Sequence, residues 1–379
     1  MDKIKIIENE KCFIESNAIE QLKSISNLEN VIRAVGLPDL HYGKGPIGAA
    51  IDVKNKIYPH LIGNDIGCGM MFIKSSITKR KFKKDKIIKK LEKIENLKNV
   101  ENINNFDDNN TFNNCNNINK LDNFSYLNNS EEKCPIVNFG TIGGGNHFAE
   151  FQILNEVFDN DEFEKLNFNK DDIMMLVHCG SRNYGEEILK KYINYDGLDS
   201  NSKSAKEYLK EHDNALVWAR LNRKEVADKL INYLGFSSEN EVIIDCYHNF
   251  IEQKDDIFIH RKGAVSSEKG LVIIPGSRGS LSYIVKPTNN TEISGFSLCH
   301  GAGRKWPRNL CKGRLENKYT KESIKETKLK SSVICHDSKL LYEEAAEAYK
   351  NIDAIINCLV EYDLIKVVAT MKPLITFKG

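Results

Sequence analysis

Long hydrophobic runs are missing from this chain of 379 residues. No apolar stretch approaches the roughly 20 residues that cross a bilayer. The start of the chain lacks both the apolar core and the small-residue cleavage site of a signal peptide. The ten cysteines form no CxxC pair and follow no disulfide spacing, which is typical of reduced thiols. We therefore expect a cytoplasmic protein with no membrane partner.

An excess charge of either sign is also missing. The formal net charge is +1, with 54 Lys and Arg against 53 Asp and Glu. No global field therefore draws the chain toward nucleic acid, and any such contact needs a local basic cleft. A Walker A motif is absent as well, because Gly43-Lys44-Gly45 has the wrong spacing and no following Ser or Thr.

Short strand-like runs alternate with helical patterns along the chain. Strands are expected at 47–53, 136–140, 174–178, 241–246, 270–274 and 295–298. Helices are expected at 79–98, 184–193, 204–235 and 340–359, and we interpret the apolar stripe of the third as core packing. The glycine motifs do not sit in a βαβ unit with an acidic residue about 20 positions on, which excludes a Rossmann fold. We predict one compact α+β domain over 1–379, with mixed β-sheets, surrounding helices and a cleft.

The composition breaks at one place, between about 96 and 130. This segment is rich in asparagine and has few apolar positions. It cannot bury enough apolar surface to offset the entropy of ordering its chain. We therefore predict an Asn-rich surface insertion within the single domain.

The stretch Asp65-Ile-Gly-Cys68-Gly-Met70 offers a carboxylate and a thiol three residues apart. Glycine lets the backbone bend so that both side chains can reach one point. One such pair binds a metal weakly, so further ligands must come from elsewhere. Four histidines stand where a strand-like run meets a small-residue or polar turn, which is where sheets present functional side chains: His147, His178, His248 and His300. His41 has an intermediate setting, whereas His60, His212, His260 and His336 are interpreted as structural.

Glycine clusters carry a second signal. Tight turns at 143–145, 275–280 and 301–304 expose backbone N–H groups that can bind phosphate oxygens. Three arginines, Arg182, Arg304 and Arg308, suggest a site for more than one phosphate. These features indicate a metal-dependent enzyme that acts on a phosphorylated substrate. Its cleft would hold two ions, Zn²⁺ or Mn²⁺, if a thiolate bridges them, and the remaining histidine could be a nucleophile.

Eight ordered motifs carry a resemblance to a known family. They are LPDLHYGKG (37–45), DIGCGM (65–70), GTIGGGNH (140–147), HCGSR (178–182), HN (248–249), PGSRGSLSY (275–283), HGAGR (300–304) and KPLITFKG (372–379). On these motifs the chain resembles the RtcB family of RNA ligases along nearly its whole length. The resemblance implies an enzyme that joins an RNA 3′-phosphate or 2′,3′-cyclic phosphate to a 5′-hydroxyl, using GTP and Mn²⁺.

The resemblance also implies residue roles. Asp65, Cys68 and His147 would hold one Mn²⁺, and Cys68 would bridge to a second ion held by His178 and His248. His300 would attack the α-phosphate of GTP and carry GMP. The guanosine nucleotide would lie among Asn146, Glu150, Gly276, Ser277, Ser282, His300, Gly301, Gly303, Tyr349 and Lys378. Arg182, Arg304 and Arg308 would hold RNA phosphates.

Two rival classes of function stay open at this stage. One is a metal-dependent phosphoesterase or another phosphotransferase on the same scaffold. The other is an RNA-binding protein with a structural metal site, although such sites typically use four Cys or His ligands. We expect a monomer. The sequence decides neither between RNA repair and tRNA splicing nor whether an activating protein is needed.

Four positions depart from the family pattern. Cys179 and Cys299 stand where serine is common, Arg278 stands where methionine is common, and Pro307 replaces a usual serine. None of them removes a proposed ligand or the nucleophile. They bear on RNA specificity and favour, without deciding it, a divergent paralogue devoted to RNA repair over one devoted to tRNA splicing.

Overall fold

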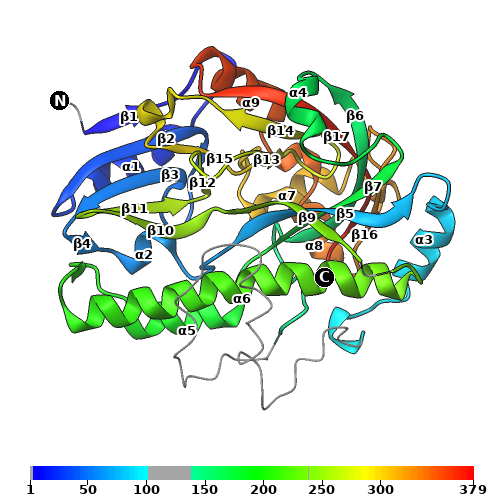
Figure 1. Cartoon of the computed structure of the whole chain (residues 1–379), viewed down its shortest axis with the longest axis horizontal. Coiled ribbons are helices and arrows are strands. Elements are labelled where there is room, and N and C mark those ends of the chain that lie inside the picture. Colours follow the sequence, from blue (N-terminus) through cyan, green and yellow to red (C-terminus); the bar gives the residue numbers. More distant parts are fainter. Residues whose placement is uncertain (1–2, 101–137, 238) are drawn as a thin grey trace.

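The computed structural model describes residues 3–100, 138–237 and 239–379 (Figure 1). One sheet has five strands in the order β1 (Ile4–Ile6), β2 (Val31–His41), β3 (Ile47–Lys54), β11 (Ile257–Lys262) and β10 (Asn249–Lys254). A larger sheet has the order β13 (Val272–Pro275), β14 (Ser282–Pro287), β17 (Ile365–Phe377), β6 (Phe148–Val157), β7 (Asp172–Cys179), β5 (Gly69–Thr78) and β9 (Glu241–Tyr247), with β16 (Ser332–Ile334) beside β17. Two short pairs join β12 (Ala264–Ser266) to β15 (Ser297–Cys299) and β4 (Lys56–Ile57) to β8 (Leu198–Asp199).

Helices surround these sheets. They are α1 (Ser16–Ser26), α2 (Pro59–Ile62), α3 (Lys84–Leu91), α4 (Asn160–Glu164), α5 (Asn183–Tyr192), α6 (Lys203–Tyr233), α7 (Arg308–Leu315), α8 (Ser338–Glu343) and α9 (Ile352–Glu361). Short 3₁₀ turns lie at Leu97–Asn99, Thr291–Ser294, Ser323–Lys325 and Ala346–Ala348. Both parallel and antiparallel strand pairs occur, so the prediction of an α+β fold with mixed sheets is confirmed. No helix of the described residues combines the length and apolarity that a bilayer crossing requires.

The larger sheet buries both of its faces. Successive side chains of a strand point to opposite faces, and β5 shows the consequence. Met70 and Phe72 pack in the cluster that contains α9, whereas Met71 and Ile73 pack in the cluster that contains α3 and α6. In Figure 1 the long helix α6 runs along the lower side of the sheet and α9 lies above it.

The predicted helix at 340–359 is wrong, because the chain forms α8 and α9 with an irregular segment between them. Asp337 caps α8 and Asn351 caps α9, so two helix starts compete with one continuous helix. Between them Tyr349 adopts an extended backbone and forms a β-bridge with Arg304. This tertiary pairing outweighs the helical periodicity and presents Tyr349 to the cavity described below.

Three other boundaries differ from the sequence prediction. The helix expected at 79–98 is shorter, because only α3 and a 3₁₀ turn form within it. The strand expected at 295–298 begins at Ser297, since Gly295 and Phe296 have positive φ angles. Asn138–Gly140 forms a turn, and the rest of the strand expected at 136–140 lies outside the described residues. The Asn-rich insertion predicted at about 96–130 also lies outside them from residue 101 onward.

Candidate active site

The predicted metal ligands lie at or near the ends of four neighbouring strands of the larger sheet. The order β6-β7-β5-β9 places these strands side by side. Gly69 at the start of β5 pairs with Cys179 at the end of β7 on one side and with Tyr247 at the end of β9 on the other. Cys68 and His248, which directly flank these strands, therefore meet, as the hydrogen bond from the His248 N–H to the Cys68 carbonyl shows (2.8 Å).

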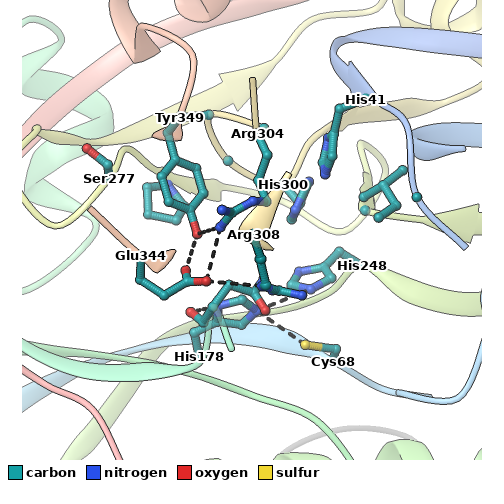
Figure 2. Close-up of a pocket in the computed structure, with 18 of the residues that line it drawn as sticks. His41, Cys68, His178, His248, Ser277, His300, Arg304, Arg308, Glu344 and Tyr349 are labelled. Carbon is teal, nitrogen blue, oxygen red and sulfur yellow. Dashed lines mark hydrogen bonds and ion pairs between the residues drawn. The ribbon is translucent and has the colours of Figure 1, made fainter. Parts of the chain in front are cut away.

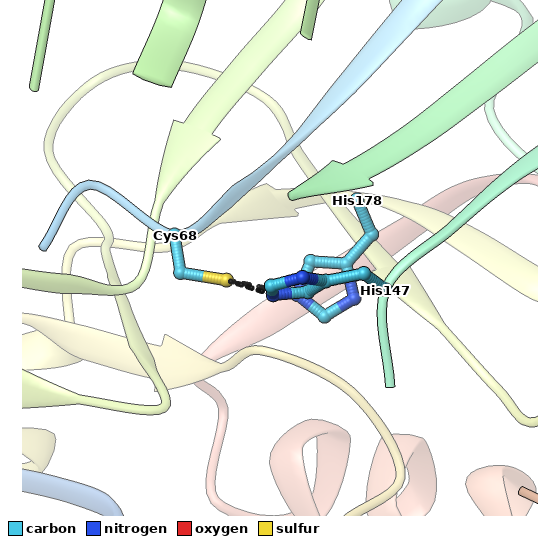
Figure 3. A group of neighbouring side chains, drawn as sticks. All are labelled: Cys68, His147 and His178. Carbon is cyan, nitrogen blue, oxygen red and sulfur yellow. Dashed lines mark hydrogen bonds between the residues drawn. The ribbon is translucent and has the colours of Figure 1, made fainter. Parts of the chain in front are cut away.

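The ligand atoms converge on the thiol of Cys68. Its Sγ lies 3.3 Å from Nε2 of His147 and 3.2 Å from Nε2 of His178 (Figure 3). Nε2 of His178 lies 3.4 Å from Nε2 of His248, and Oδ2 of Asp65 lies 2.9 Å from Nε2 of His147. Cys68, His147 and His178 are buried and form a group that could hold a metal ion. The thiol lies between the Asp65–His147 pair and the His178–His248 pair.

The protonation states of these groups suit metal binding. Burial lowers the pKa of His178 and His248 well below the usual value, so both imidazoles are neutral and keep a lone pair. Burial raises the pKa of the Cys68 thiol well above its usual value, and the carboxylate of Asp65 raises it further. A thiolate at this position therefore requires a cation beside it. Thiolate, imidazole and carboxylate together favour a divalent transition metal.

A buried arginine on α6, Arg223, connects the strand ends that carry the predicted ligands. Nη1 of Arg223 donates to the carbonyls of Gly67 (2.8 Å) and Cys179 (3.0 Å), the residues next to Cys68 and His178. Its other nitrogens donate to Oδ1 of Asp245 on β9 (2.8 and 3.0 Å). The guanidinium thus fixes three of the strand ends that carry ligands.

Asn222, the residue before Arg223, fixes the loop that leads to His147. Its Oδ1 accepts from the N–H of Gly140 (2.7 Å), and its Nδ2 donates to the carbonyl of Thr141 (3.1 Å). These residues begin the motif that ends at His147. The same Nδ2 contacts Sγ of Cys179 at 3.2 Å, so the departure from serine at this position keeps a hydrogen-bond acceptor.

Replacing Arg223 with methionine should weaken divalent-metal binding about tenfold or more, because support behind metal ligands typically contributes 10–100-fold in affinity. The measurement is calorimetric titration of the folded variant with Mn²⁺. Arg220→Met is the matched control, since Arg220 also pairs with Asp245 (3.5 Å), whereas Arg223 donates to the carbonyls of Gly67 and Cys179. Equal loss of affinity in both variants would contradict the role assigned to the carbonyl contacts.

His300 directly follows β15 and lies next to the predicted metal ligands. Its Nδ1 lies 2.6 Å from Oδ2 of Asp39, and its backbone N–H donates to the same oxygen (3.3 Å). Oδ2 of Asp39 accepts from this backbone N–H, and it is placed to accept from Nδ1 as well, so in the neutral form of the ring Nδ1 carries the proton and Nε2 carries the lone pair. The His300 ring lies 4.8 Å from the His248 ring, centroid to centroid. The structure thus brings an oriented imidazole beside the metal ligands.

A cavity of about 960 Å³ joins these groups to most of the predicted nucleotide residues (Figure 2). Its lining includes Asn146, Glu150, Gly276, Ser277, His300, Gly301, Gly303, Tyr349, Lys378, Arg304 and Arg308. Ser282 lies behind Glu150, where its hydroxyl accepts from Nε2 of Gln152 (2.8 Å). Arg182 lies beside the metal ligands, with Nη1 3.4 Å from Nδ1 of His147. Its guanidinium fills the space that a side chain at Gly143 would occupy.

Glu344 organises one wall of the cavity. It accepts from Nη1 of Arg304 (3.0 Å), Nε of Arg308 (3.2 Å) and the hydroxyl of Tyr349. Arg304 also donates to the carbonyl of Glu343 (2.8 Å) and to the hydroxyl of Tyr349 (3.2 Å). Its donors are thus shared among protein groups, whereas the side chain of Arg308 is 47% exposed. Arg308 is the better placed of the two to meet a phosphate.

Sequence reasoning missed two residues of this site. Asp39 sits in the motif at 37–45, so its presence in a recognised motif was a usable signal. Glu344 gave no such signal in the sequence, because it falls within the stretch 340–359 that was predicted as one helix. Among the other histidines, His41 lines the cavity, whereas His212 and His260 accept from the backbone N–H groups of Ile251 (3.0 Å) and Tyr58 (2.9 Å).

The remaining departures from the family pattern lie close to the cavity. Arg278 lines it and donates to the carbonyl of Ile324 (3.1 Å). Pro307 precedes α7, and its carbonyl accepts from the N–H of Leu310 (3.1 Å). Cys299 is buried directly before His300. These residues shape the cavity without replacing a ligand atom.

Two buried charges mark the inner end of the cavity. Burial raises the pKa of Glu150 to about 7, although Thr376 and Gln152 donate hydrogen bonds to it. Burial lowers the pKa of Lys378 to about 8, and its Nζ donates to the carbonyl of His147 (2.9 Å). Near neutral pH both groups can therefore change charge with small changes in their surroundings.

Glu150 should make the protein less stable as the pH rises. Its folded-state pKa of about 7 lies above the ordinary value of 4.5, so folding favours the protonated form. The resulting stabilisation is present below pH 4.5 and is lost as the pH rises to about 7, a total of about 3 kcal/mol. Glu150→Gln should therefore gain stability relative to the native chain over this window. Urea unfolding of both chains at a series of pH values tests this, and a difference that does not change with pH would contradict it.

The fold and the site define a candidate metalloenzyme with a nucleophile-like histidine beside a Cys/His centre. Residues 21–379 match the family described as tRNA-splicing ligase RtcB, and the chain belongs to this family. It is 39% identical to RNA-splicing ligase RtcB2 of Escherichia coli strain ATCC 25922, over all of this chain and 96% of that protein. It is 27% identical to RNA-splicing ligase RtcB of Escherichia coli K12, over 97% of this chain and 95% of that protein. It is also 27% identical to tRNA-splicing ligase RtcB of Archaeoglobus fulgidus, over 97% and 92% of the two chains.

Proposed function

We propose that this chain is a GTP- and Mn²⁺-dependent RNA ligase. It joins an RNA 3′-phosphate or 2′,3′-cyclic phosphate end to a 5′-hydroxyl end through a His300–GMP intermediate, in RNA repair or tRNA splicing. The observation that carries the proposal is the contact of 2.6 Å between Asp39 and Nδ1 of His300, next to the Cys68 centre. It orients the imidazole for attack on phosphorus in the cavity that Cys68, His178 and His248 line.

Five residues would hold two Mn²⁺ ions. Asp65, Cys68 and His147 form one set, and Cys68, His178 and His248 form the other, which agrees with the contacts of 2.9–3.4 Å between their donor atoms. Bound Mn²⁺ would supply positive charge that draws electron density from phosphate oxygens. The chain's own contribution is to place a buried thiol between the imidazoles of His147 and His178. Burial also keeps the imidazoles of His178 and His248 neutral by lowering their pKa.

His300 would perform the first step. The lone pair on its Nε2 attacks the α-phosphorus of GTP, a P–N bond forms, the P–O bond to pyrophosphate breaks, and pyrophosphate leaves. Asp39 accepts the hydrogen bond from Nδ1–H, which keeps the ring oriented and stabilises the positive charge that develops on it. The side chain of Arg308 faces the same cavity and can meet the departing phosphates.

The guanylate then passes from His300 to RNA. A 2′,3′-cyclic phosphate is first hydrolysed to a 3′-phosphate: a water oxygen attacks phosphorus, the P–O bond to the 2′-oxygen breaks, and the 2′-hydroxyl is released. An oxygen of the 3′-phosphate attacks the phosphorus of the His300 adduct, and the imidazole leaves as the neutral ring. The 5′-hydroxyl of the second strand attacks the activated 3′-phosphate, a phosphodiester forms, and GMP leaves. Backbone donors at Gly301 and Gly303 line the cavity where these charges develop.

The inner end of the cavity suits a guanine nucleotide. Tyr349 presents a ring for stacking, held by Glu344 and Arg304. Glu150 can accept from guanine N–H groups, and Lys378 can donate to a base oxygen. Ser277 adds a hydroxyl on the same side of His300 (Figure 2).

Mass spectrometry after incubation with GTP and Mn²⁺ tests this proposal. We expect a GMP adduct on His300, pyrophosphate release, and joined RNA when both strands are added. Hydrolysis of a phosphate ester with no adduct would instead indicate a metal-dependent phosphoesterase on the same scaffold. An adduct on a different residue would keep the ligase proposal and remove the assignment of the nucleophile.

A further inference from the structure

Two buried thiols, those of Cys12 and Cys358, lie next to each other close to Asp39. They share a side-chain hydrogen bond, and both residues belong to one core cluster. Sγ of Cys12 also lies 3.2 Å from the carbonyl oxygen of Pro38, the residue before Asp39. Both thiols are free. The chain therefore holds an unlinked pair of thiols beside the segment whose carboxylate orients His300.

Further hydrogen bonds hold together the two segments that carry these thiols. Nδ2 of Asn9 donates to Oε2 of Glu361 (2.6 Å). The hydroxyl of Tyr362 donates to the carbonyl of Glu8 (3.0 Å). All four residues lie within a few positions of one of the two thiols. The packing of α9 on the N-terminal segment therefore fixes the approach of the two sulfurs.

The surroundings give the two thiols different reactivities. The hydrogen bond with Cys358 lowers the pKa of the Cys12 thiol, and the ammonium of Lys350 lowers it further. Burial and the carboxylates of Asp39 and Glu8 oppose this shift without reversing it. The same hydrogen bond, together with burial, raises the pKa of Cys358. Because the thiolate is the reactive form of cysteine, Cys12 is the thiol that reacts first with an oxidant.

The thiol of Cys12 contacts a part of β2 that the sheet itself does not hold. The pairing of β2 with β3 is interrupted at 36–41, and the carbonyl of Pro38 accepts from the Cys12 thiol within this stretch. The next residue, Asp39, is fully buried and closely surrounded, since a side-chain atom at Gly303 would clash with its carbonyl. A change at Cys12 is therefore passed on to the carboxylate.

We propose that Cys12 and Cys358 form a reversible disulfide when the protein meets hydrogen peroxide, and that this disulfide slows the first step of the reaction. The side chain after Cys12, that of Phe13, is 74% exposed, so the thiol lies just beneath the surface, where a small oxidant can reach it. A reactive thiol beside a second thiol is the usual arrangement of redox-sensing cysteines.

The reaction with peroxide has two steps. The thiolate of Cys12 attacks one peroxide oxygen, the O–O bond breaks, Cys12 becomes a sulfenic acid, and the released hydroxide takes up a proton and leaves as water. The sulfur of Cys358 then attacks the sulfenic sulfur, the S–S bond forms, the S–O bond breaks, and the oxygen leaves with the thiol proton as a second water. The two sulfurs are oxidised and the peroxide is reduced. A dithiol reductant reverses the change by thiol–disulfide exchange.

The disulfide should disturb the orientation of His300. It removes the S–H group that donates to Pro38, and it draws the sulfur of Cys12 to about 2.0 Å from that of Cys358. Asp39 then shifts relative to Nδ1 of His300, and a misplacement of about 1 Å can lower a rate by about 10²-fold. We expect self-guanylylation to slow about tenfold or more. This effect rests on the proposed ligase function, whereas formation of the disulfide does not.

Peptide mapping under non-reducing conditions tests the disulfide directly. The full-length, Mn²⁺-loaded chain is treated with hydrogen peroxide, its remaining thiols are alkylated, and it is digested with trypsin. Cleavage after lysine places Cys12 in the peptide 12–23 and Cys358 in the peptide 351–366, and neither peptide contains another cysteine. We expect the two peptides to be linked and dithiothreitol to release them. Separate peptides after peroxide treatment would overturn the inference.

The rate of self-guanylylation tests the consequence. The oxidised native chain should react about tenfold or more slowly, and dithiothreitol should restore its rate. Cys12→Ser keeps a hydroxyl that can donate to Pro38, and both it and Cys358→Ala should keep their rates after peroxide treatment. Cys335→Ser is the matched control, since the Cys335 thiol also donates to a backbone carbonyl, that of Asp337 (3.3 Å), and this variant should slow as the native chain does. An equal loss of rate in Cys12→Ser would refute the proposed switch.

Oxidation of Cys68 would give a different result, because Cys68 is a proposed metal ligand. It would remove Mn²⁺ and stop every step that needs the metal. We expect the oxidised native chain to keep its metal and to seal RNA that already carries guanylate at its 3′ end, since that step does not need His300. Loss of Mn²⁺ and of sealing together with guanylylation would assign the inactivation to Cys68 and overturn the inference.

Failure of the ligase proposal can be distinguished from failure of this inference. In that case the native chain forms no GMP adduct before oxidation, and peptide mapping still decides whether the disulfide forms. Hydrogen exchange of the segment 36–41 then reports its effect on Asp39. Oxidation should speed exchange of this segment in the native chain but not in Cys358→Ala. Linked peptides with unchanged exchange would show that the disulfide does not reach Asp39, and the inference would be wrong.

Discussion

Replacing His300 with alanine should abolish self-guanylylation and the joining of 3′-phosphate ends. The imidazole is the group that Asp39 orients toward the cavity, and alanine leaves no nitrogen to attack phosphorus. Loss of a nucleophile typically lowers such rates by factors on the order of 10⁴–10⁶. The measurement is the mass of the protein after incubation with GTP and Mn²⁺, together with the yield of joined RNA.

The His300→Ala variant should keep two functions that do not need the nucleophile. It should bind Mn²⁺ as the native chain does, because the ligand contacts run through Cys68 and its neighbours. It should also seal RNA that arrives with guanylate already attached to its 3′ end. His336→Ala, at an exposed position, is the control and should retain the adduct. A protein that loses metal, adduct and sealing together would indicate a structural role for His300, and an adduct on the folded variant would identify another nucleophile.

The residues proposed as metal ligands could be selected from the sequence because each stands in a local motif at a strand end. The register of β6, β7, β5 and β9 then brings those strand ends together. The contact between Asp39 and His300 joins residues 261 positions apart. No local pattern specifies such a pair, even though both residues lie in recognised motifs. Only the three-dimensional fold brings the motif at 37–45 against the motif at 300–304.

Helix periodicity predicted α6 well but did not identify the second role of its buried surface. The apolar stripe does pack in the core, as Val226 and Leu230 show. The same buried surface also carries Asn222 and Arg223, whose polar groups hold the loops of the metal centre. Periodicity records which positions face inward, but it does not distinguish a core contact from a polar support. The helix prediction failed around Tyr349 because the pairing of Tyr349 with Arg304 overrides a local helical pattern.

Replacing Cys68 with alanine should remove both metal ions. Its Sγ lies between Nε2 of His147 and Nε2 of His178, at 3.3 and 3.2 Å, so one substitution takes a donor from both proposed ligand sets. His178→Ala should mainly affect one ion, because the Asp65–His147 pair stays in place. Elemental analysis of the purified proteins after Mn²⁺ loading measures the number of ions bound per chain.

Cys358→Ala is the control for the loss of a buried thiol, since Cys358 lies on α9 in the core cluster and is not among the ligands. It should keep two ions and full guanylylation, whereas Cys68→Ala should lose both. The burial that raises the pKa of the Cys68 thiol explains why metal and thiolate depend on each other: without the cation the thiol stays protonated, and without the thiolate each remaining set has only two ligands. Two bound ions in Cys68→Ala would mean that the sets do not share this sulfur, and the bridging assignment would have to be abandoned.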